Sequence, residues 1–99
     1  MKVYLSGPIT GTTDYMKHFG EDQKILETLG HTVINPALVN SNLPKDTTHG
    51  EYMRMSFCML DMCDAICMLP GYKKSVGARH ELFKAKLKGL TEIYIHGVR

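Results

Sequence analysis

Residues 64–81 read Asp-Ala-Ile-Cys-Met-Leu-Pro-Gly-Tyr-Lys-Lys-Ser-Val-Gly-Ala-Arg-His-Glu, and the class of fold follows from this stretch. Its first part, Asp64 to Leu69, is a continuous apolar run halted by Pro70-Gly71, which is typical of a strand buried on both faces of a parallel sheet. Residues 75–90 then have the spacing of a helix, with Ser75 as a candidate N-cap. A buried strand, a turn and a helix together make the repeating unit of an α/β fold.

The same alternation extends outward over the rest of the chain. Further strands are predicted at residues 2–5, 31–34 and 92–95, and further helices at 14–29 and 51–63. Residues 37–50 are too polar and irregular to predict an element, and a loop of this length is long enough to be a lid. The order βαβαβαβ predicts one domain over residues 1–99, a small three-layer Rossmann/flavodoxin-like α/β fold. Its parallel sheet is expected to have about four strands in the order 2-1-3-4, flanked by helices.

Composition and charge limit the classes to which the protein can belong. With 99 residues, 43% of them hydrophobic and 22% charged, the chain is expected to fold as one globular domain. A formal net charge of +2, without an extended basic run, argues against nucleic acid as the principal partner. No apolar segment approaches the roughly 20 residues of a membrane span, and the first residues lack the features of a signal peptide. We therefore expect a cytoplasmic protein without a membrane partner.

Three cysteines, Cys58, Cys63 and Cys67, lie in an apolar stretch. Their odd number, without a secretory context, predicts reduced and buried thiols rather than a disulfide framework. Their spacing is a weak signal for zinc, and the five histidines include no pair at ligand spacing on one helix. No metal and no cofactor is expected.

The helix predicted at residues 75–90 has two apolar sides. One is a stripe of mostly small residues that would allow close packing on a sheet: Ala78, Leu82, Ala85 and Gly89. The other, almost opposite, is bulky: Val76, Phe83, Leu87 and Leu90. The helix predicted at 51–63 is also apolar nearly all round. We therefore expect a homo-oligomer, a dimer or larger, that associates through the second and third helices. The alternative is a small core that uses methionine as filler.

Glu81 lies beside the small-residue stripe, where a carboxylate would be partly desolvated against the sheet. It is about 9 Å along the helix axis from Ser75, given a rise of about 1.5 Å per residue, and could therefore reach a ligand held by the loops. The alternative is a surface glutamate that pairs with Arg79, Lys84 or Lys88.

Two glycine-bearing turns, residues 6–11 and 70–75, follow strands of the predicted sheet. Ligands of parallel sheets bind beyond the carboxyl ends of the strands, where these turns meet. Ser75 and Gly77 open the following helix with a hydroxyl and N–H groups, an arrangement that favours an anion, although Ser75 as a plain cap fits equally well. The Gly-x-x-x-Gly spacing of the first turn is a weak signal and matches neither a Walker loop nor a dinucleotide fingerprint.

Several motifs occur in a specific order along the chain: Tyr4-Leu5-Ser6-Gly7-Pro8-Ile9-Thr10-Gly11, Asn35-Pro36-Ala37, Tyr52-Met53-Arg54, Cys63-Asp64-Ala65-Ile66, Leu69-Pro70-Gly71 and Ser75-x-Gly77-Ala78-x-x-Glu81. Together they resemble a phage and prophage family of unassigned function, the DUF4406 type, within the nucleoside 2-deoxyribosyltransferase-like superfamily. The resemblance extends from Val3 to about Ile95, and the ordered set is far more specific than any one motif.

The resemblance implies cleavage or transfer of the N-glycosidic bond of a 2′-deoxynucleoside 5′-monophosphate. Glu81 matches the nucleophile that attacks the sugar C1′, in the manner of a retaining glycosidase. Tyr4 matches a tyrosine that orients this nucleophile, and Ser75 matches the serine that holds the 5′-phosphate. By the same resemblance, backbone groups complete the anion cradle: Gly7, Ile9, Gly11 and Gly77.

Ser56 departs from the pattern of the relatives, which carry an aspartate there that helps to protonate the leaving base or to hold the sugar. A serine hydroxyl cannot act as a general acid in the same way. Asp61 or Asp64 could substitute, solvent could supply the proton, or the chain could bind a nucleotide without cutting it. Asp61 is about 140° around the helix from Ser56, and Asp64 opens a strand, where a cap is the commoner role. Ser56 and Asp64 stay among the candidate substrate-binding residues, and the second hypothesis is a non-catalytic nucleotide-binding or sequestering module.

Overall fold

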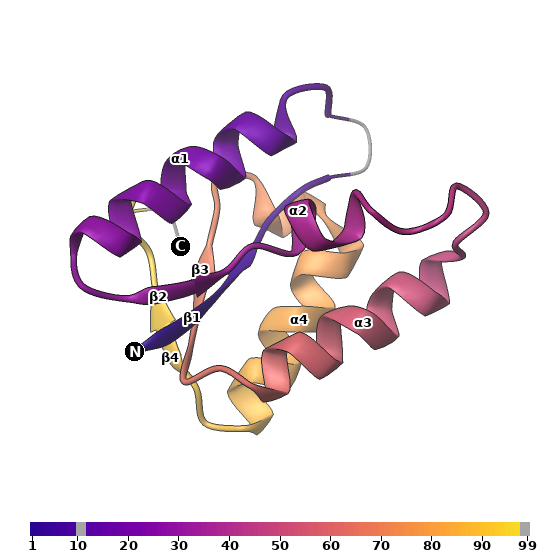
Figure 1. Cartoon of the computed structure of the whole chain (residues 1–99). Coiled ribbons are helices and arrows are strands. Elements are labelled where there is room, and N and C mark those ends of the chain that lie inside the picture. Colours follow the sequence, from indigo (N-terminus) through magenta and orange to yellow (C-terminus); the bar gives the residue numbers. More distant parts are fainter. Residues whose placement is uncertain (10–11, 98–99) are drawn as a thin grey trace.

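The computed structural model describes residues 1–9 and 12–97. Within these residues a parallel sheet has four strands in the order β2-β1-β3-β4, as Figure 1 shows. The strands are β1 (Lys2–Ser6), β2 (Thr32–Ile34), β3 (Ala65–Met68) and β4 (Thr91–Ile93). The predicted α/β class and the predicted strand order 2-1-3-4 are both confirmed.

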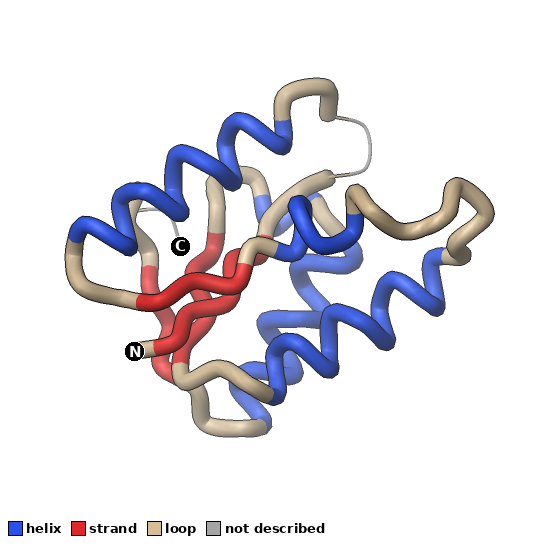
Figure 2. The backbone as a smooth tube through the Cα atoms, viewed as in Figure 1, coloured by secondary structure: helices blue, strands red, loops and turns tan. Residues whose placement is uncertain are grey.

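Helices cover both faces of the sheet and make a three-layer molecule (Figures 1 and 2). The helical elements are α1 (Tyr15–Thr28), α2 (Pro36–Asn40), α3 (His49–Asp61), the 3-10 turn η1 (Tyr72–Lys74) and α4 (Val76–Leu87). One layer is α1 alone, and the opposite layer is the pair α3 and α4. The predicted helices are therefore present, with ends that differ from the predicted ones by one to three residues at each end.

The two central strands divide the core into two halves. Alternate residues of a strand point to opposite faces, so Tyr4 and Ile66 pack toward α3 and α4. Val3 and Leu5 pack toward α1 on the other face. Because β1 and β3 are paired along their length and buried, their carboxyl ends stop side by side under the loops that follow.

Helix α2 corrects the prediction of an irregular loop over residues 37–50. The Asn35 side chain caps it, since its Oδ1 accepts hydrogen bonds from the backbone N–H groups of Ala37 and Leu38. Pro36 occupies the first turn, where its fixed φ and missing N–H cost nothing. Asn-Pro is thus a helix start as well as the end of a strand. The lid stays a prediction.

Helix α3 begins two residues earlier than predicted because Thr48 and Glu51 form a capping box. The Thr48 hydroxyl accepts from the Glu51 backbone N–H at 3.1 Å, and the Glu51 carboxylate accepts from the Thr48 backbone N–H at 2.8 Å. This start brings His49 into the first turn of α3.

The outer side of α4 is uncovered in the single chain. Val76, Phe83 and Leu87 are 52%, 65% and 70% exposed, as expected for a bulky stripe that faces away from the sheet. The homo-oligomer that would cover them stays a prediction.

Cys58 corrects the expectation of three buried thiols, because it is exposed on α3. Cys63 and Cys67 are buried, and burial raises the pKa of each thiol to about 11. All three cysteines are free rather than disulfide-bonded.

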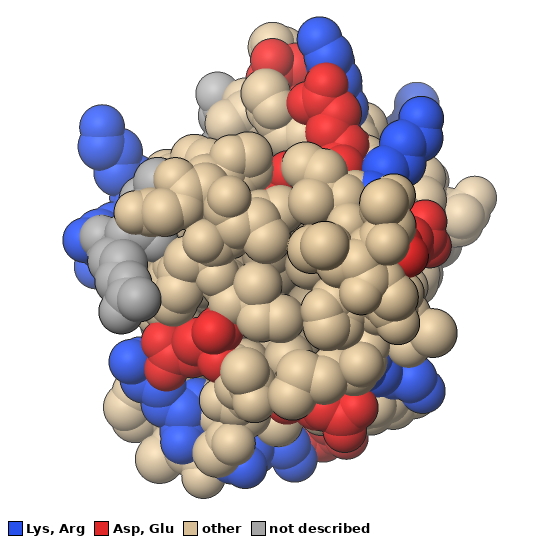
Figure 3. All heavy atoms as spheres, turned by 90° about the vertical axis from the view of Figure 1, so that its left-hand side faces the viewer, with Lys and Arg blue, Asp and Glu red and all other residues tan. Residues whose placement is uncertain are grey.

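On the face shown in Figure 3, lysine, arginine and acidic side chains alternate around the rim, and uncharged residues fill the centre. This face therefore carries no continuous basic surface. No helix in the described part of the chain has the length and apolarity needed to cross a membrane.

Candidate active site

Glu81 is buried on the inner side of α4. Ala78 and Ala85, one turn on either side of it, are 2% and 0% exposed, so the helix packs closely on the sheet at this point. This leaves Glu81 only 8% exposed. The alternative of a solvated ion pair is contradicted, since Lys88 instead contacts Asp61, with 2.7 Å between Nζ and Oδ1.

Two hydroxyl groups of β1 hold the two oxygens of the Glu81 carboxylate. The Tyr4 hydroxyl donates to Oε2 at 2.7 Å, and the Ser6 hydroxyl donates to Oε1 at 2.6 Å. Tyr4 and Ser6 are two residues apart on a strand and therefore point to the same face. Ser6 was missed as a side-chain partner in the sequence, although its spacing from Tyr4 would have indicated it.

Burial raises the pKa of Glu81 above its ordinary value, and the hydroxyls of Ser6, Tyr4 and Ser56 offset part of this rise. The pKa of Tyr4 is well above its ordinary value, first because the ring is buried and next because the Glu81 charge is adjacent. Tyr4 therefore keeps its proton and acts as a donor. The site holds a poorly hydrated carboxylate whose position is fixed by hydroxyl groups.

The first turn of α4 lies at the mouth of the same site. The Ser75 hydroxyl is the N-cap and accepts from the Ala78 backbone N–H at 3.2 Å. Ser75 and Gly77 both line the cavity above Glu81, with Ile9 from the loop after β1. The predicted neighbours Ser75, Gly77 and Glu81 are thus brought together.

Gly7 allows the turn after β1 to approach the end of β3. A Cβ at this position would lie 2.7 Å from the Leu69 Cβ, closer than real side chains pack. Gly7 also lines the cavity. Gly11, the other glycine of the predicted cradle, lies outside the described residues.

Asp64 is a correction to the predicted site. Its carboxylate accepts a hydrogen bond from the backbone N–H of Lys2 at 3.0 Å, at the edge of the sheet where the strands begin. The cavity of Glu81 lies at the opposite edge, where the strands end. Ser56, in contrast, is buried and lines the cavity beside Tyr4 and Glu81.

The cavity has a volume of about 100 Å³, and residues of β1, α2, α3 and α4 line it. Asn40, His49 and Met53 are lining residues that the sequence interpretation missed. Met53 shares a helix face with Ser56, and this spacing was the available signal for it, whereas His49 lies outside the helix predicted at 51–63 and had no such signal. Asn40 had no such signal, because α2 was not predicted.

A second cavity of about 280 Å³ adjoins the first and shares Ile9 and Asn40 with it. The Asn40 side-chain oxygen is buried there and has no hydrogen-bond partner among the described residues. A buried carbonyl without a partner costs free energy. No three His, Cys, Asp or Glu side chains are grouped to hold a metal ion within the described ranges.

Comparison with known proteins agrees with this architecture. A family model described as a domain of unknown function, DUF4406, matches residues 1–94. The chain belongs to the DUF4406 family. No curated protein matches the sequence of this DUF4406 protein.

Among solved structures, the DUF4406 chain is similar to a 2-deoxyribosyltransferase from Bacillus psychrosaccharolyticus, with a TM-score of 0.76 and 19% sequence identity. The match covers 95% of this chain and 71% of the other. At that identity the similarity establishes the fold. The predicted family and fold are therefore confirmed.

Proposed function

We propose that this DUF4406 protein cleaves or transfers the N-glycosidic bond of a 2′-deoxynucleoside 5′-monophosphate, with Glu81 as the nucleophile. The observation that carries the proposal is the buried Glu81 carboxylate, whose oxygens accept hydrogen bonds from Tyr4 and Ser6 at the floor of a cavity. An isolated carboxylate in a core is costly. Its retention beside a cavity is a common property of catalytic groups.

The Glu81 carboxylate has about four lone-pair positions, more than the hydroxyls of Tyr4, Ser6 and Ser56 use, and can therefore make another contact. In the proposed first step, one oxygen attacks C1′ and forms an ester while the bond from C1′ to the base nitrogen breaks. The bonding electron pair leaves with the base, which takes a proton from water. In the second step water, or a second base, attacks C1′ and releases the carboxylate.

Size and chemistry support an orientation for the substrate. Ligand sites commonly have volumes of about 300 Å³ or more, so the 100 Å³ cavity suits the sugar alone. The phosphate would lie at the start of α4, where the Gly77 backbone N–H and the Ser75 hydroxyl can donate, since the Ser75 backbone N–H already donates to the Tyr72 carbonyl. The base would extend into the second cavity.

A second candidate function is a nucleotide-binding module without catalysis. Ser56 favours it, because retaining glycosidases use a pair of carboxylates and Glu81 is the only carboxylate among the described residues that line the cavity. Binding would use the same cavities and need no leaving-group chemistry.

The test is incubation of the protein with each common 2′-deoxynucleoside 5′-monophosphate, with release of the base followed by chromatography. The proposal expects release by the wild type and its loss in Glu81→Gln. The matched control is Glu27→Gln on the exposed side of α1, which should release base at the wild-type rate.

The reaction would then be stopped with acid, which denatures the protein with the intermediate still attached. Mass spectrometry of the chain should detect a bound pentose phosphate. Release that persists in Glu81→Gln would contradict the assigned nucleophile. Tight binding of a monophosphate, measured by calorimetry, without any release would favour the second candidate.

A further inference from the structure

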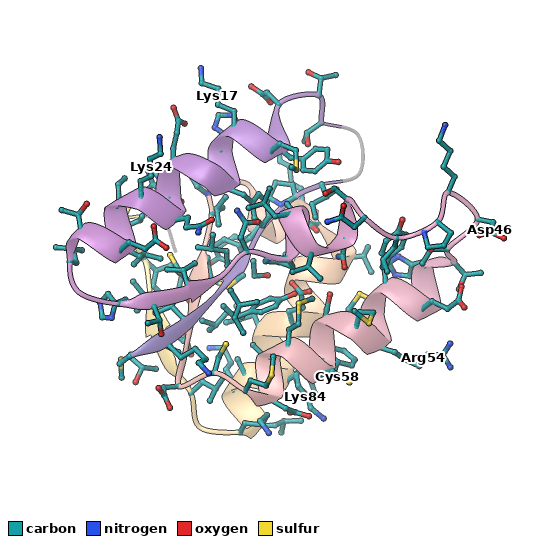
Figure 4. All side chains as sticks on the ribbon, viewed as in Figure 1. Lys17, Lys24, Asp46, Arg54, Cys58 and Lys84 are labelled. Carbon is teal, nitrogen blue, oxygen red and sulfur yellow. The ribbon has the colours of Figure 1, made fainter. Side chains whose placement is uncertain are left out.

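The Glu81 cavity contains almost no positive charge. Among the described residues that line it, the only side chain that can become cationic is His49. Figure 4 shows the labelled Lys17 and Lys24 on the outer side of α1, and Arg54 pointing outward from α3. A phosphate monoester carries a charge of about −1.5 to −2 at neutral pH. Because no described lysine or arginine lines the cavity, His49 is the one candidate for a cationic side-chain partner of the phosphate among the described residues.

The contacts between α3 and α4 place His49 along the cavity. A Cβ on Gly77 would lie 3.6 Å from the Met53 Sδ, which puts Met53 beside the first turn of α4. Farther along both helices, Lys84 lies over the Phe57 ring, with 5.7 Å between Nζ and the ring centroid. The contacts therefore advance in the same direction on both helices, whose ribbons in Figure 1 are drawn closest toward their C-terminal ends and farther apart at their N-terminal ends.

His49 is one helical turn before Met53 on the same face of α3, and Ser56 is one turn after Met53. Ser56 lies beside Tyr4 and Glu81. His49 therefore lies at the other end of this face, near the level where α4 begins. About 10 Å of helix rise separates His49 from Ser56, close to the roughly 9 Å of rise that separates Ser75 from Glu81. His49 and the start of α4 therefore lie at similar distances along their helices from the neighbouring pair Ser56 and Glu81.

We propose that His49 is a specificity-determining residue that binds the 5′-phosphate of the substrate together with the N–H groups opening α4. This inference rests on the proposed function for the identity of the substrate. A protonated imidazole donates from both ring nitrogens and a neutral one from a single nitrogen, so either form can donate to a phosphate oxygen. Specificity for the monophosphate over the free deoxynucleoside then depends on His49 as well as on the start of α4.

The experiment compares kcat/KM for a 2′-deoxynucleoside 5′-monophosphate with kcat/KM for the matching deoxynucleoside. The wild type should prefer the monophosphate. His49→Gln should lower this preference by about tenfold to a hundredfold through KM, the range expected when a hydrogen bond to a charged group is lost. It should lower kcat/KM for the deoxynucleoside much less than kcat/KM for the monophosphate. His49→Lys, which keeps a positive charge, should retain most of the preference.

Two control variants separate this role from other causes. His80→Gln changes an exposed histidine of α4 outside the cavity and should leave both constants unchanged. Lys45→Gln removes the cation that lines the second cavity and should leave the preference for the monophosphate unchanged. Thermal melts of His49→Gln should match those of the wild type, because His49 is exposed at the start of α3.

Binding of the same monophosphate and deoxynucleoside by calorimetry distinguishes this inference from the proposed catalysis. If the wild type releases no base but His49→Gln weakens binding of the monophosphate selectively, catalysis fails and the role of His49 is supported. An unchanged preference in His49→Gln, an equal loss for both ligands, or a loss in Lys45→Gln instead would overturn the inference. A wild type that neither binds nor cleaves a monophosphate would overturn both.

Discussion

The inner and outer sides of α4 reverse the usual distribution of polar and apolar residues. The inner side buries the Glu81 carboxylate at 8% exposure, whereas the outer side leaves Phe83 and Leu87 at 65% and 70% exposure. A helix whose residues served stability alone would have apolar residues on its inner side and charged residues on its outer side. A buried carboxylate lowers stability unless it is compensated, and this is consistent with the proposed role of Glu81, while the exposed apolar residues are consistent with the predicted homo-oligomer.

The largest expected effect comes from removing the charge on the inner side. If Glu81 is the nucleophile, Glu81→Gln should lower base release at least about 10³-fold, or ~4 kcal/mol in transition-state stabilisation. Steady-state assays with the monophosphate that the wild type cleaves fastest would measure this loss.

The same variant should be at least as stable as the wild type near neutral pH. Because the folded pKa of Glu81 is raised, folding favours the protonated acid, and this stabilisation is lost as pH rises through the folded pKa. Glutamine has no such loss. Calorimetric melts at several pH values should show Glu81→Gln gaining a few degrees over the wild type at pH 8 and little at pH 4. A less stable variant at pH 8 would contradict the account of α4.

The second effect tests the close packing of the inner side. Ala85 is 0% exposed between α4 and the sheet, so Ala85→Leu should overpack the contact and cost about 1–3 kcal/mol of unfolding free energy. Leu87→Ala on the outer side is the matched control, with an expected change within about 0.5 kcal/mol. Urea unfolding of both variants would measure this contrast, and equal losses would remove the distinction between the two sides.

A smaller effect is expected from the hydroxyl that orients the carboxylate. The hydrogen bond from Tyr4 to Oε2 lowers the pKa of Glu81. Tyr4→Phe removes this hydrogen bond, so the pKa of Glu81 should rise further. Base release requires the ionised carboxylate, and the rate should therefore fall as pH decreases, starting at a higher pH than for an ordinary glutamate. In Tyr4→Phe this fall should begin at still higher pH. The plateau rate should be about tenfold lower, or ~1.4 kcal/mol.

A pH profile of kcat for the wild type and Tyr4→Phe would measure both effects. Tyr94→Phe, which changes a hydroxyl outside the cavity, is the control. An identical acid limb in the wild type and Tyr4→Phe would show that Tyr4 does not act on Glu81.

The smallest effect on the stability of a single chain is expected on the outer side of α4. Phe83→Glu combined with Leu87→Glu changes exposed side chains and should alter the unfolding free energy by about 0.5 kcal/mol or less. If a second copy covers this stripe, sedimentation velocity should show an assembly for the wild type and single chains for the double variant. An assembly that survives the substitutions would place the interface elsewhere.

Much of the fold was predictable because its signals are local. The apolar run of β3, the glycine-bearing turns and the two-sided α4 each follow from a few neighbouring residues. Helix α2 was missed because its five residues are too few for a periodic pattern, and only the Asn35 cap and Pro36 marked it. The start of α3 was misplaced because a capping box depends on two side chains that a periodicity search ignores.

The candidate site residues also separate into those that local signals indicated and those that they did not. Glu81, Tyr4 and Ser75 were found from their motifs, and Ser6 from β1 could have been found from its spacing to Tyr4. Asp64 was misassigned although it opens a strand, because the amino ends of parallel strands lie at the edge of the sheet opposite the site.

Sequence alone determined the strands, the three longer helices, the parallel sheet and a carboxylate on the close-packed side of α4, because periodicity and turns are properties of neighbouring residues. Only the tertiary structure decided which groups surround that carboxylate. Asn40 and His49 enter the site from α2 and α3, and their positions depend on how these helices pack across β1 and against α4. Such packing is fixed by contacts between residues far apart in the chain, and these contacts cannot be predicted from a pattern of neighbouring residues.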